Sequence, residues 1–432
     1  MHMHFTRLFL ITITLIFISS LFSQLRIEIK GGLEDPIRIA IAPMKWNSDK
    51  TQKQFFHKII KSDLEYFGEF DVISPQNMLS LPTTREEVFF KDWRLLDVDY
   101  LVIGQVNPSD LENEIETSYI LFDIVRKKII HRGKVLGSIN SIRRIGHKIS
   151  DVIYEKIQGI PGIYSTQIAY IDKPSKSDPN YNLMISDIDG FKSLSLYSSP
   201  QPLMSPSWSP DKENIAYVSF EEGTSRIFIQ KLSNAERKGL KLEEGINSSP
   251  NWSPNGSRLS AVLSKTGNPD IFIYDLNSSS WSQLTKHFGI DTEPDWSPNS
   301  RKIIFTSNRS GSPQIYEVNV RTKKTKRLTF EGTYNARGRY LPDGENIVFV
   351  HRRNGIFHIA TQNLKSGKIR ILTDTSLDES PTVSPNGNVV LYATKSGDKD
   401  ILAGITLDGA TKFIMPSLKG EAREPSWSPL ID

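Results

Sequence analysis

The sequence has 432 residues, of which 38% are hydrophobic and 24% are charged, with a formal net charge of +4 and no cysteine. This length allows two or three domains, and the nearly balanced charges do not indicate a nucleic-acid-binding protein. The lack of cysteine excludes disulfides, thiolate catalysis, cysteine zinc sites and a lipidated N-terminal cysteine.

Residues 1–23 predict an export signal that is cleaved near residue 23. Arg7 supplies the positive charge, residues 8–18 form an apolar run, and small residues lead to Ser23. A membrane anchor is the alternative, but the apolar run is short for a span and no later segment reaches spanning length. We therefore expect secretion, with no direct membrane insertion after cleavage.

Residues 24–35 predict an extended N-terminal arm. Apolar and polar side chains alternate here as in a strand, at Leu25, Arg26, Ile27, Glu28, Ile29 and Lys30. Gly31-Gly32 and Asp35-Pro36 punctuate the end of this segment. The pattern fits either a loosely docked arm or the first strand of the next domain.

Residues 36–163 predict a small α/β domain, because strand-like and helix-like segments alternate. Strands are expected at 37–43, 70–73 and 100–104, and a hairpin at 116–125 and 128–136. Helices are expected after residue 48, with an apolar face from Phe56 to Phe67, at 85–96, and at 142–157. Three histidines lie here without a second histidine at metal-ligand spacing, so no catalytic residue, metal or cofactor is expected.

Residues 164–432 contain a repeat with a period of 43 or 44 residues. Full Pro-x-Trp-Ser-Pro copies begin at Pro206, Pro250, Pro294 and Pro425, and weaker copies lie at 340–343 and 383–386. Strand-like segments and turn residues fill each interval, which is typical of propeller blades of four strands. The repeated tryptophan is expected to pack between neighbouring blades.

The repeats predict six blades. The first blade, with strands at 168–171 and 182–185, lacks a preceding copy of the motif, and the last copy, at 425–429, has no strands after it. Placing this C-terminal strand innermost in the first blade closes the ring and leaves no open edge in the circle.

Successive connections in such a blade alternate between two faces of the propeller. The turns after Trp-Ser-Pro lie on one, which we call the turn face. The loops after each second strand and the crossovers into the next innermost strand lie on the other, which we call the crossover face. Long, varied loops are where binding usually resides.

The whole chain resembles the TolB family of the Tol-Pal envelope system. The resemblance rests on the Trp-Ser-Pro repeats, Tyr164–Tyr170, Leu183–Gly190 and Arg143–Asp151, in this order after an N-terminal domain. Two departures stand out: Ile246 replaces a common histidine, and Tyr340-Leu341-Pro342 departs from the repeat.

The resemblance implies a periplasmic, monomeric scaffold and not an enzyme. It implies that the arm, at Leu25–Lys30, binds a TolA-like inner-membrane protein, and that the propeller mouth binds a peptidoglycan-associated lipoprotein (Pal), supporting outer-membrane integrity and constriction during division. The mouth residues implied are Ile246, Ser249, Thr292 and Glu293. The alternative is an exported propeller hydrolase or lyase with a channel active site; a peptidase would need a Gly-x-Ser-x-Gly elbow, which the sequence lacks.

Overall fold

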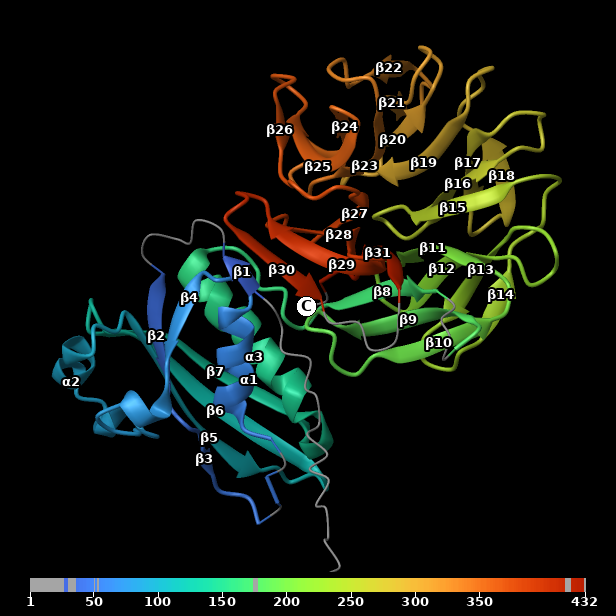
Figure 1. The fold of residues 1–432 in the computed structure, drawn as a ribbon. Coiled ribbons are helices and arrows are strands. Elements are labelled where there is room, and N and C mark those ends of the chain that lie inside the picture. The colour runs from blue at the N-terminus through green and yellow to red at the C-terminus, as the bar shows by residue number, and fades with distance from the viewer. Residues whose placement is uncertain are drawn as a thin grey trace, which may run out of the picture.

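The computed structural model describes residues 27–29, 36–49, 51–52, 54–173, 178–415 and 421–430. The expected export signal and most of the arm, including Leu25, Arg26 and Lys30, lie outside the described residues. Figure 1 shows an N-terminal α/β domain beside a propeller. None of the helices in the described ranges is long and apolar enough to cross a membrane.

The α/β domain is built on one mixed sheet. The sheet order is β4-β2-β5-β6-β7, with β3 paired to β5; β2 is parallel to β4 and β5, and β5, β6 and β7 are antiparallel. The strands are β2 (Ile37–Ile41), β3 (Lys45–Trp46), β4 (Phe70–Ile73), β5 (Tyr100–Pro108), β6 (Glu114–Asp123) and β7 (Lys128–Ser138). The helices are α1 (Phe56–Glu65), α2 (Phe90–Leu95) and α3 (Ile142–Gln158).

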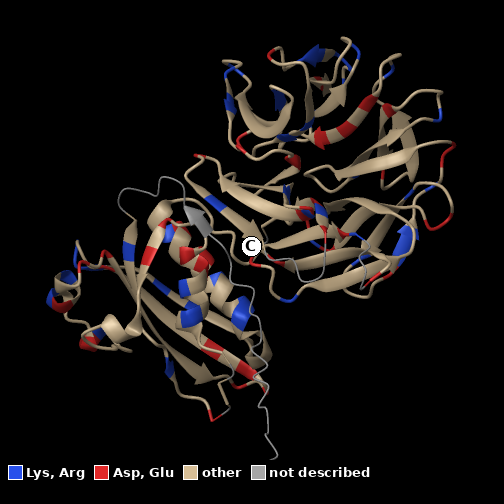
Figure 2. Cartoon of the chain, viewed as in Figure 1, with Lys and Arg blue, Asp and Glu red and all other residues tan. Residues whose placement is uncertain are grey.

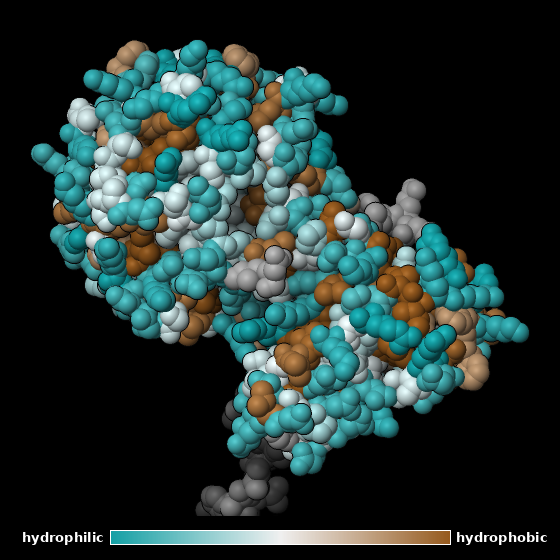
Figure 3. Space-filling model, turned by 180° about the vertical axis from the view of Figure 1, so that it is seen from behind, coloured by the Kyte–Doolittle hydropathy of each residue, from teal (hydrophilic) through white to brown (hydrophobic). Residues whose placement is uncertain are grey.

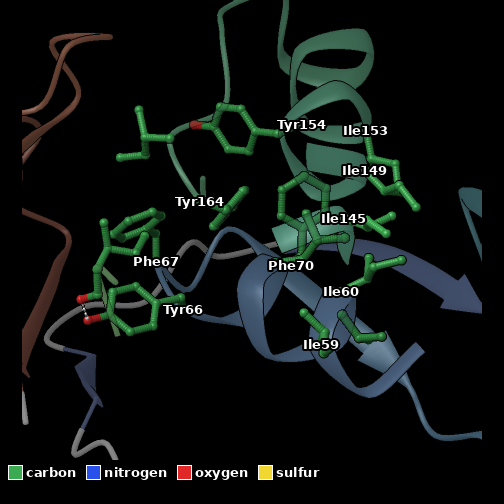
Figure 4. Packing of buried hydrophobic residues seen from close by; sticks show 14 of the residues in the cluster. Ile59, Ile60, Tyr66, Phe67, Phe70, Ile145, Ile149, Ile153, Tyr154 and Tyr164 are labelled. Atoms are coloured by element: carbon green, nitrogen blue, oxygen red, sulfur yellow. Dashed lines mark hydrogen bonds between the residues drawn. The ribbon is translucent and has the colours of Figure 1, made fainter. Parts of the chain in front are cut away.

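Helices α1 and α3 cover one face of this sheet because each has an apolar stripe at helical spacing. Ile59 and Ile60 of α1 lie near Ile145 and Ile149 of α3, and all four are buried (Figure 4). Gly159 ends α3 in the left-handed conformation, with φ of 79°, which glycine adopts without strain. Both predicted apolar faces are confirmed.

The helix predicted at residues 85–96 is wrong as a single element. The chain forms a 3-10 turn at Arg85–Glu87 and then α2, with Val88 and Phe89 extended between them. The Glu87 carboxylate accepts hydrogen bonds from the backbone N–H groups of Thr83, at 2.6 Å, and Thr84, at 3.3 Å. This local cap competes with a continuous helix.

The propeller has six blades of four antiparallel strands, and its closure by the C-terminal strand is confirmed. Blades 1 and 2 comprise, from the innermost strand outwards, β31 (Ala422–Trp427), β8 (Gln167–Asp172), β9 (Tyr181–Asp187), β10 (Leu194–Ser199); and β11 (Leu203–Trp208), β12 (Asn214–Ser219), β13 (Arg226–Lys231), β14 (Arg237–Gly239). Blades 3 and 4 comprise β15 (Asn247–Trp252), β16 (Arg258–Leu263), β17 (Asp270–Asp275), β18 (Ser280–Gln283); and β19 (Asp291–Trp296), β20 (Lys302–Ser307), β21 (Gln314–Asn319), β22 (Thr325–Arg327). Blades 5 and 6 comprise β23 (Asn335–Tyr340), β24 (Asn346–Arg353), β25 (Ile356–Asn363), β26 (Ile369–Ile371); and β27 (Glu379–Val383), β28 (Val389–Ser396), β29 (Lys399–Thr406), β30 (Thr411–Met415).

The repeated tryptophans pack between blades, as predicted. Trp208 is buried in a cluster with blade 1 residues, and its indole N–H donates to the carbonyl of Ser426 at 3.0 Å. Trp296 of blade 4 packs in the same way against blade 3, and its indole N–H donates to the carbonyl of Asn251 at 3.1 Å. In blade 5, Tyr340 takes this place and is buried, with its hydroxyl donating to Glu317 at 2.9 Å. The departure from the repeat therefore preserves the blade.

The arm adds to the propeller and not to the α/β sheet. Strand β1 (Ile27–Ile29) pairs antiparallel with β30, so the sheet of blade 6 has a fifth strand at its outer edge. The extended conformation predicted for Ile27, Glu28 and Ile29 is confirmed. The alternative, in which these residues begin the α/β sheet, is wrong.

The α/β domain packs against the turn-face side of blades 1 and 6. Tyr66 and Phe67, just after α1, pack against Phe413 of β30 with inclined rings, at centroid distances of 5.0 and 5.6 Å (Figure 4 shows Tyr66 and Phe67). The Tyr66 hydroxyl donates to the carbonyl of Ile188 at 2.8 Å, and Arg143 forms ion pairs in the same turn of blade 1. The Asn386 amide in a blade 6 turn donates to the carbonyl of Pro161 at 2.9 Å. Among the residues that the structure describes, these contacts leave the crossover face free of the α/β domain.

Candidate partner-binding site

The innermost strands of all six blades surround a central cavity of about 820 Å³. Each strand begins at the crossover face and runs toward its Trp-Ser-Pro copy. Serine, asparagine and threonine side chains line the wall together with a few charged ones, apolar Met204, Phe220 and Ile246 lie toward the crossover face, and the repeat prolines border the other end. In the space-filling view, apolar residues form separate patches within a largely hydrophilic surface (Figure 3).

Every innermost strand has a β-bulge at the same place. The register with the second strand shifts in all six blades, and the bulged residue has a left-handed φ between 49° and 55°. We call these six residues the bulge ring: Ser205, Ser249, Glu293, Arg337, Ser380 and Glu424. Because none is glycine, each conformation is strained and is held by its surroundings.

The bulge ring links neighbouring blades across the channel wall. The Glu293 carboxylate accepts the backbone N–H of Arg337 at 3.0 Å and the hydroxyl of Thr306 at 2.8 Å, and it pairs with the Arg337 guanidinium at 2.9 Å. Arg337 in turn donates to the Ser380 hydroxyl, which connects blades 4, 5 and 6. On the opposite side, the Glu424 carboxylate of blade 1 accepts the backbone N–H of Ser205 in blade 2.

A second layer of charge lies deeper in the channel. Burial raises the pKa of Asp295, although nearby Arg339 and hydrogen bonds from the Tyr340 backbone N–H, at 2.9 Å, and the Asn251 amide, at 3.4 Å, favour the carboxylate. Across the described ranges, no group of three or more His, Asp or Glu side chains is arranged to hold a metal ion.

The four mouth residues named from the sequence come together around the channel. Ile246, Ser249, Thr292 and Glu293 all line the cavity. Ile246 is 46% exposed just before β15, and Thr292 is half-buried at the start of β19. Ser249 and Glu293 occupy equivalent bulge-ring positions. Glu293 is engaged by Arg337 and Thr306, whereas Thr292 has no side-chain hydrogen bond to any described residue and Ile246 has an apolar side chain.

The arm residues lie elsewhere. Ile27, Glu28 and Ile29 pair with β30 at the outer edge of blade 6, away from the channel wall. The arm and the mouth are therefore separate candidate surfaces.

Two side chains near the mouth gave no signal in the sequence. Phe288 and Phe330 lie in the crossovers into β19 and β23 and are 85% and 73% exposed. From sequence alone, an apolar residue within a repeat is expected to be buried in the core, so the exposure of these two phenylalanines could be found only from the structure.

Comparison with known proteins settles the family. The family model described as TolB beta propeller domain matches residues 154–431, and the model described as TolB amino-terminal domain matches residues 25–130. The chain belongs to the TolB family.

Several family members align with it over nearly their whole length. The Tol-Pal system protein TolB of Pseudomonas syringae pv. syringae (strain B728a) is 48% identical over 97% of this chain and 98% of its own. The protein of that name from Marinomonas sp. (strain MWYL1) is 56% identical over 96% of each chain. The crystal structure of TolB from Acinetobacter baumannii superposes with a TM-score of 0.85 at 37% identity, covering 94% of this chain and all of that one. The resemblance inferred from the repeats is thus confirmed.

Proposed function

We propose that this TolB-family chain is a non-enzymatic, monomeric scaffold in the periplasm that binds a peptidoglycan-associated lipoprotein at the propeller mouth and a TolA-like protein through its arm. In this role it would support outer-membrane integrity and envelope constriction during division. Membership of a family whose members are named Tol-Pal system proteins supports the class of partner.

The observation that carries the lipoprotein site is the position of the mouth on the face that the α/β domain leaves free. The α/β domain contacts turns of blades 1 and 6 on the turn-face side. Ile246, Ser249, Thr292 and Glu293 open onto the crossover face instead. A globular partner can therefore cover the mouth without displacing a domain of this chain.

The arm fits a partner that recognises an extended backbone. Three of its residues already pair as an edge strand, and edge pairing is the basis of β-augmentation. The arm can offer the same backbone groups to a TolA-like protein once it leaves β30.

Thr292→Lys tests the lipoprotein site. Thr292 faces the cavity, so the longer charged side chain should obstruct a partner without disturbing the buried Trp296. We expect unchanged folding and at least tenfold weaker binding to the periplasmic domain of Pal, measured by isothermal titration calorimetry.

Arg321→Glu is the control, because Arg321 is exposed in the turn after β21 on the turn face. If the Arg321 variant lost binding and the Thr292 variant kept it, the site would lie on the turn face, and the proposed crossover-face site would be refuted.

A further inference from the structure

Two exposed aromatic side chains flank one loop of blade 4 on the crossover face. Phe288 and Phe330 are 85% and 73% exposed, and Ile290 is exposed between Phe288 and the start of β19. Exposed apolar groups of this size in neighbouring loops mark a protein-binding surface more often than isolated exposed aliphatic residues do.

The loops that carry them are fixed by hydrogen bonds. The Asn268 amide donates to the carbonyls of His287, at 2.9 Å, and Gly289, at 2.7 Å, on either side of Phe288. The Asn335 amide donates to the carbonyl of Glu331, next to Phe330, at 2.9 Å. Both rings therefore project from ordered backbone, so binding through them costs little loop ordering.

The same surface is continuous through the loop after β20. The Ile290 backbone N–H donates to Asn308 at 2.8 Å, and Arg327 donates to Ser310 at 3.4 Å. The Arg327 guanidinium lies 5.0 Å from the Phe330 ring centroid. We call Phe288, Ile290, Phe330, Arg327, Arg352 and Arg353 the aromatic sector.

The charge around these rings is basic. Arg352 and Arg353 are exposed at the end of β24, which is tied to the Phe330 loop by the Arg352 backbone N–H, donating to the carbonyl of Tyr334 at 3.0 Å. Within the described part of the chain, Arg327, Arg352 and Arg353 have no carboxylate within ion-pair distance. Glu331 is the exposed acid beside Phe330. Arginine and aromatic side chains together are the usual composition of interface hot spots.

The sector also lies within reach of a partner seated on the mouth. Phe288 precedes Thr292 by four residues, so their Cα atoms are about 14 Å apart at most. A standard interface of about 800 Å² per partner corresponds to a disc of about 16 Å radius. A partner seated on Thr292 can therefore also contact Phe288, and the loop after β20 joins Phe288 and Ile290 to Arg327 and Phe330.

We propose that the aromatic sector is a second contact region for the lipoprotein partner and receives an apolar surface of that partner rimmed by Asp or Glu side chains. This inference rests on the proposed function, because it assigns the chemistry of the same partner. It adds hot-spot residues outside the channel and predicts that basic charge speeds association.

The test is binding of the purified Pal periplasmic domain to the full mature chain. The Phe288→Ala/Phe330→Ala double variant should keep the wild-type Tm, because both side chains are exposed, and should bind at least tenfold more weakly. The Arg352→Glu/Arg353→Glu variant should lower the association rate several-fold at low salt, with the difference shrinking in 0.5 M NaCl. The control is Phe89→Ala/Leu95→Ala, which removes side chains 64% and 80% exposed on the α/β domain; it should bind normally.

The outcomes separate the two proposals. Wild-type affinity of the double phenylalanine variant, together with weak binding of Thr292→Lys, would overturn the aromatic sector and leave the mouth site intact. Failure of the wild-type chain to bind Pal would overturn the proposed function and this inference with it. An association rate unchanged in the arginine variant would refute the acidic rim.

Discussion

Closure of the propeller is tested most directly at Trp427, the last tryptophan of the repeat. Its side chain is 8% exposed in β31, and its indole N–H donates to the Thr166 hydroxyl at 2.8 Å. It belongs to a core cluster that joins Ile168 of blade 1 to Val389 and Leu391 of blade 6. Trp427→Ala would therefore loosen the two blades that meet at the point of closure.

The expected loss of stability follows from two contributions. Replacing a buried tryptophan with alanine costs about 3–5 kcal/mol, because transfer free energy is lost and a cavity remains. Removing the indole donor from the buried Thr166 hydroxyl, which still donates to the Ile163 carbonyl, adds about 1 kcal/mol. At about 2 °C per kcal/mol for a domain of this size, Tm should fall by about 10 °C.

Thermal unfolding followed by near-ultraviolet circular dichroism measures this difference. Trp281→Ala is the matched control: Trp281 lies on the outermost strand β18 of blade 3, is partly exposed and contacts Tyr274 at 4.9 Å between ring centroids. It should lose less than half as much stability. Truncation before Glu424 should go further and cause aggregation, because it exposes the edge of β8. A Trp427 variant within about 2 °C of wild type, or a monomeric and stable truncation, would refute closure by β31.

Three further predictions concern the arm, the bulge ring and pH. Deleting residues 24–35 should abolish binding to a TolA-like partner while lowering Tm by no more than about 3 °C, because the described strand β1 pairs through only three residues. Glu293→Gln should lower the free energy of unfolding in urea by about 1–2 kcal/mol through loss of its partly exposed ion pair with Arg337, and should add little once Arg337→Gln is present. Burial raises the pKa of Asp151 to about 6 in the folded state, whereas the unfolded state releases this proton near pH 3.8. The contribution of Asp151 to the free energy of unfolding therefore falls as the pH rises from about 4 to 6. Asp151→Asn should flatten the pH dependence of the free energy of unfolding, measured in urea, across that range.

The number of blades and the closure of the ring could be predicted because both follow from the spacing and the number of the sequence repeats. Trp208, Trp252 and Trp296 recur at intervals of 44 residues, and the last copy has no strands of its own, which leaves one position for it in a closed ring. The helix faces of α1 and α3 were equally accessible, since periodic apolar residues specify which side is buried.

Contacts between segments that are far apart in the chain could not be predicted from the sequence. The sequence pattern places Tyr66 and Phe67 at the end of a helix, yet they pack edge-on or tilted against Phe413 of blade 6. The pairing of Ile27–Ile29 with β30 likewise joins segments almost 400 residues apart. Local pattern shows that such residues are apolar or extended but not what they meet.

The bulge ring could not be predicted from the sequence for a different reason. Left-handed backbone is usually signalled by glycine or asparagine, but these six positions hold serine, glutamate and arginine. The conformation is imposed by pairing on both sides of the strand. It turns Glu293 toward Arg337 and Thr306, so a residue named as a partner contact also forms part of the wall.

This dual position decides how binding data at the mouth should be interpreted. A Glu293 variant that binds Pal weakly could have lost either a contact or the link between blades 4 and 5, and affinity alone does not separate these causes. Thr292 precedes it in the same strand, lines the same cavity and has no side-chain hydrogen bond within the described residues. A loss of affinity in Thr292→Lys at unchanged Tm therefore reports obstruction of the mouth, and the Glu293→Gln result can be corrected by its measured stability. If Glu293→Gln binds Pal normally despite a lower free energy of unfolding, the Glu293 carboxylate stabilises the channel wall, and the contacts with the partner are made by neighbouring residues.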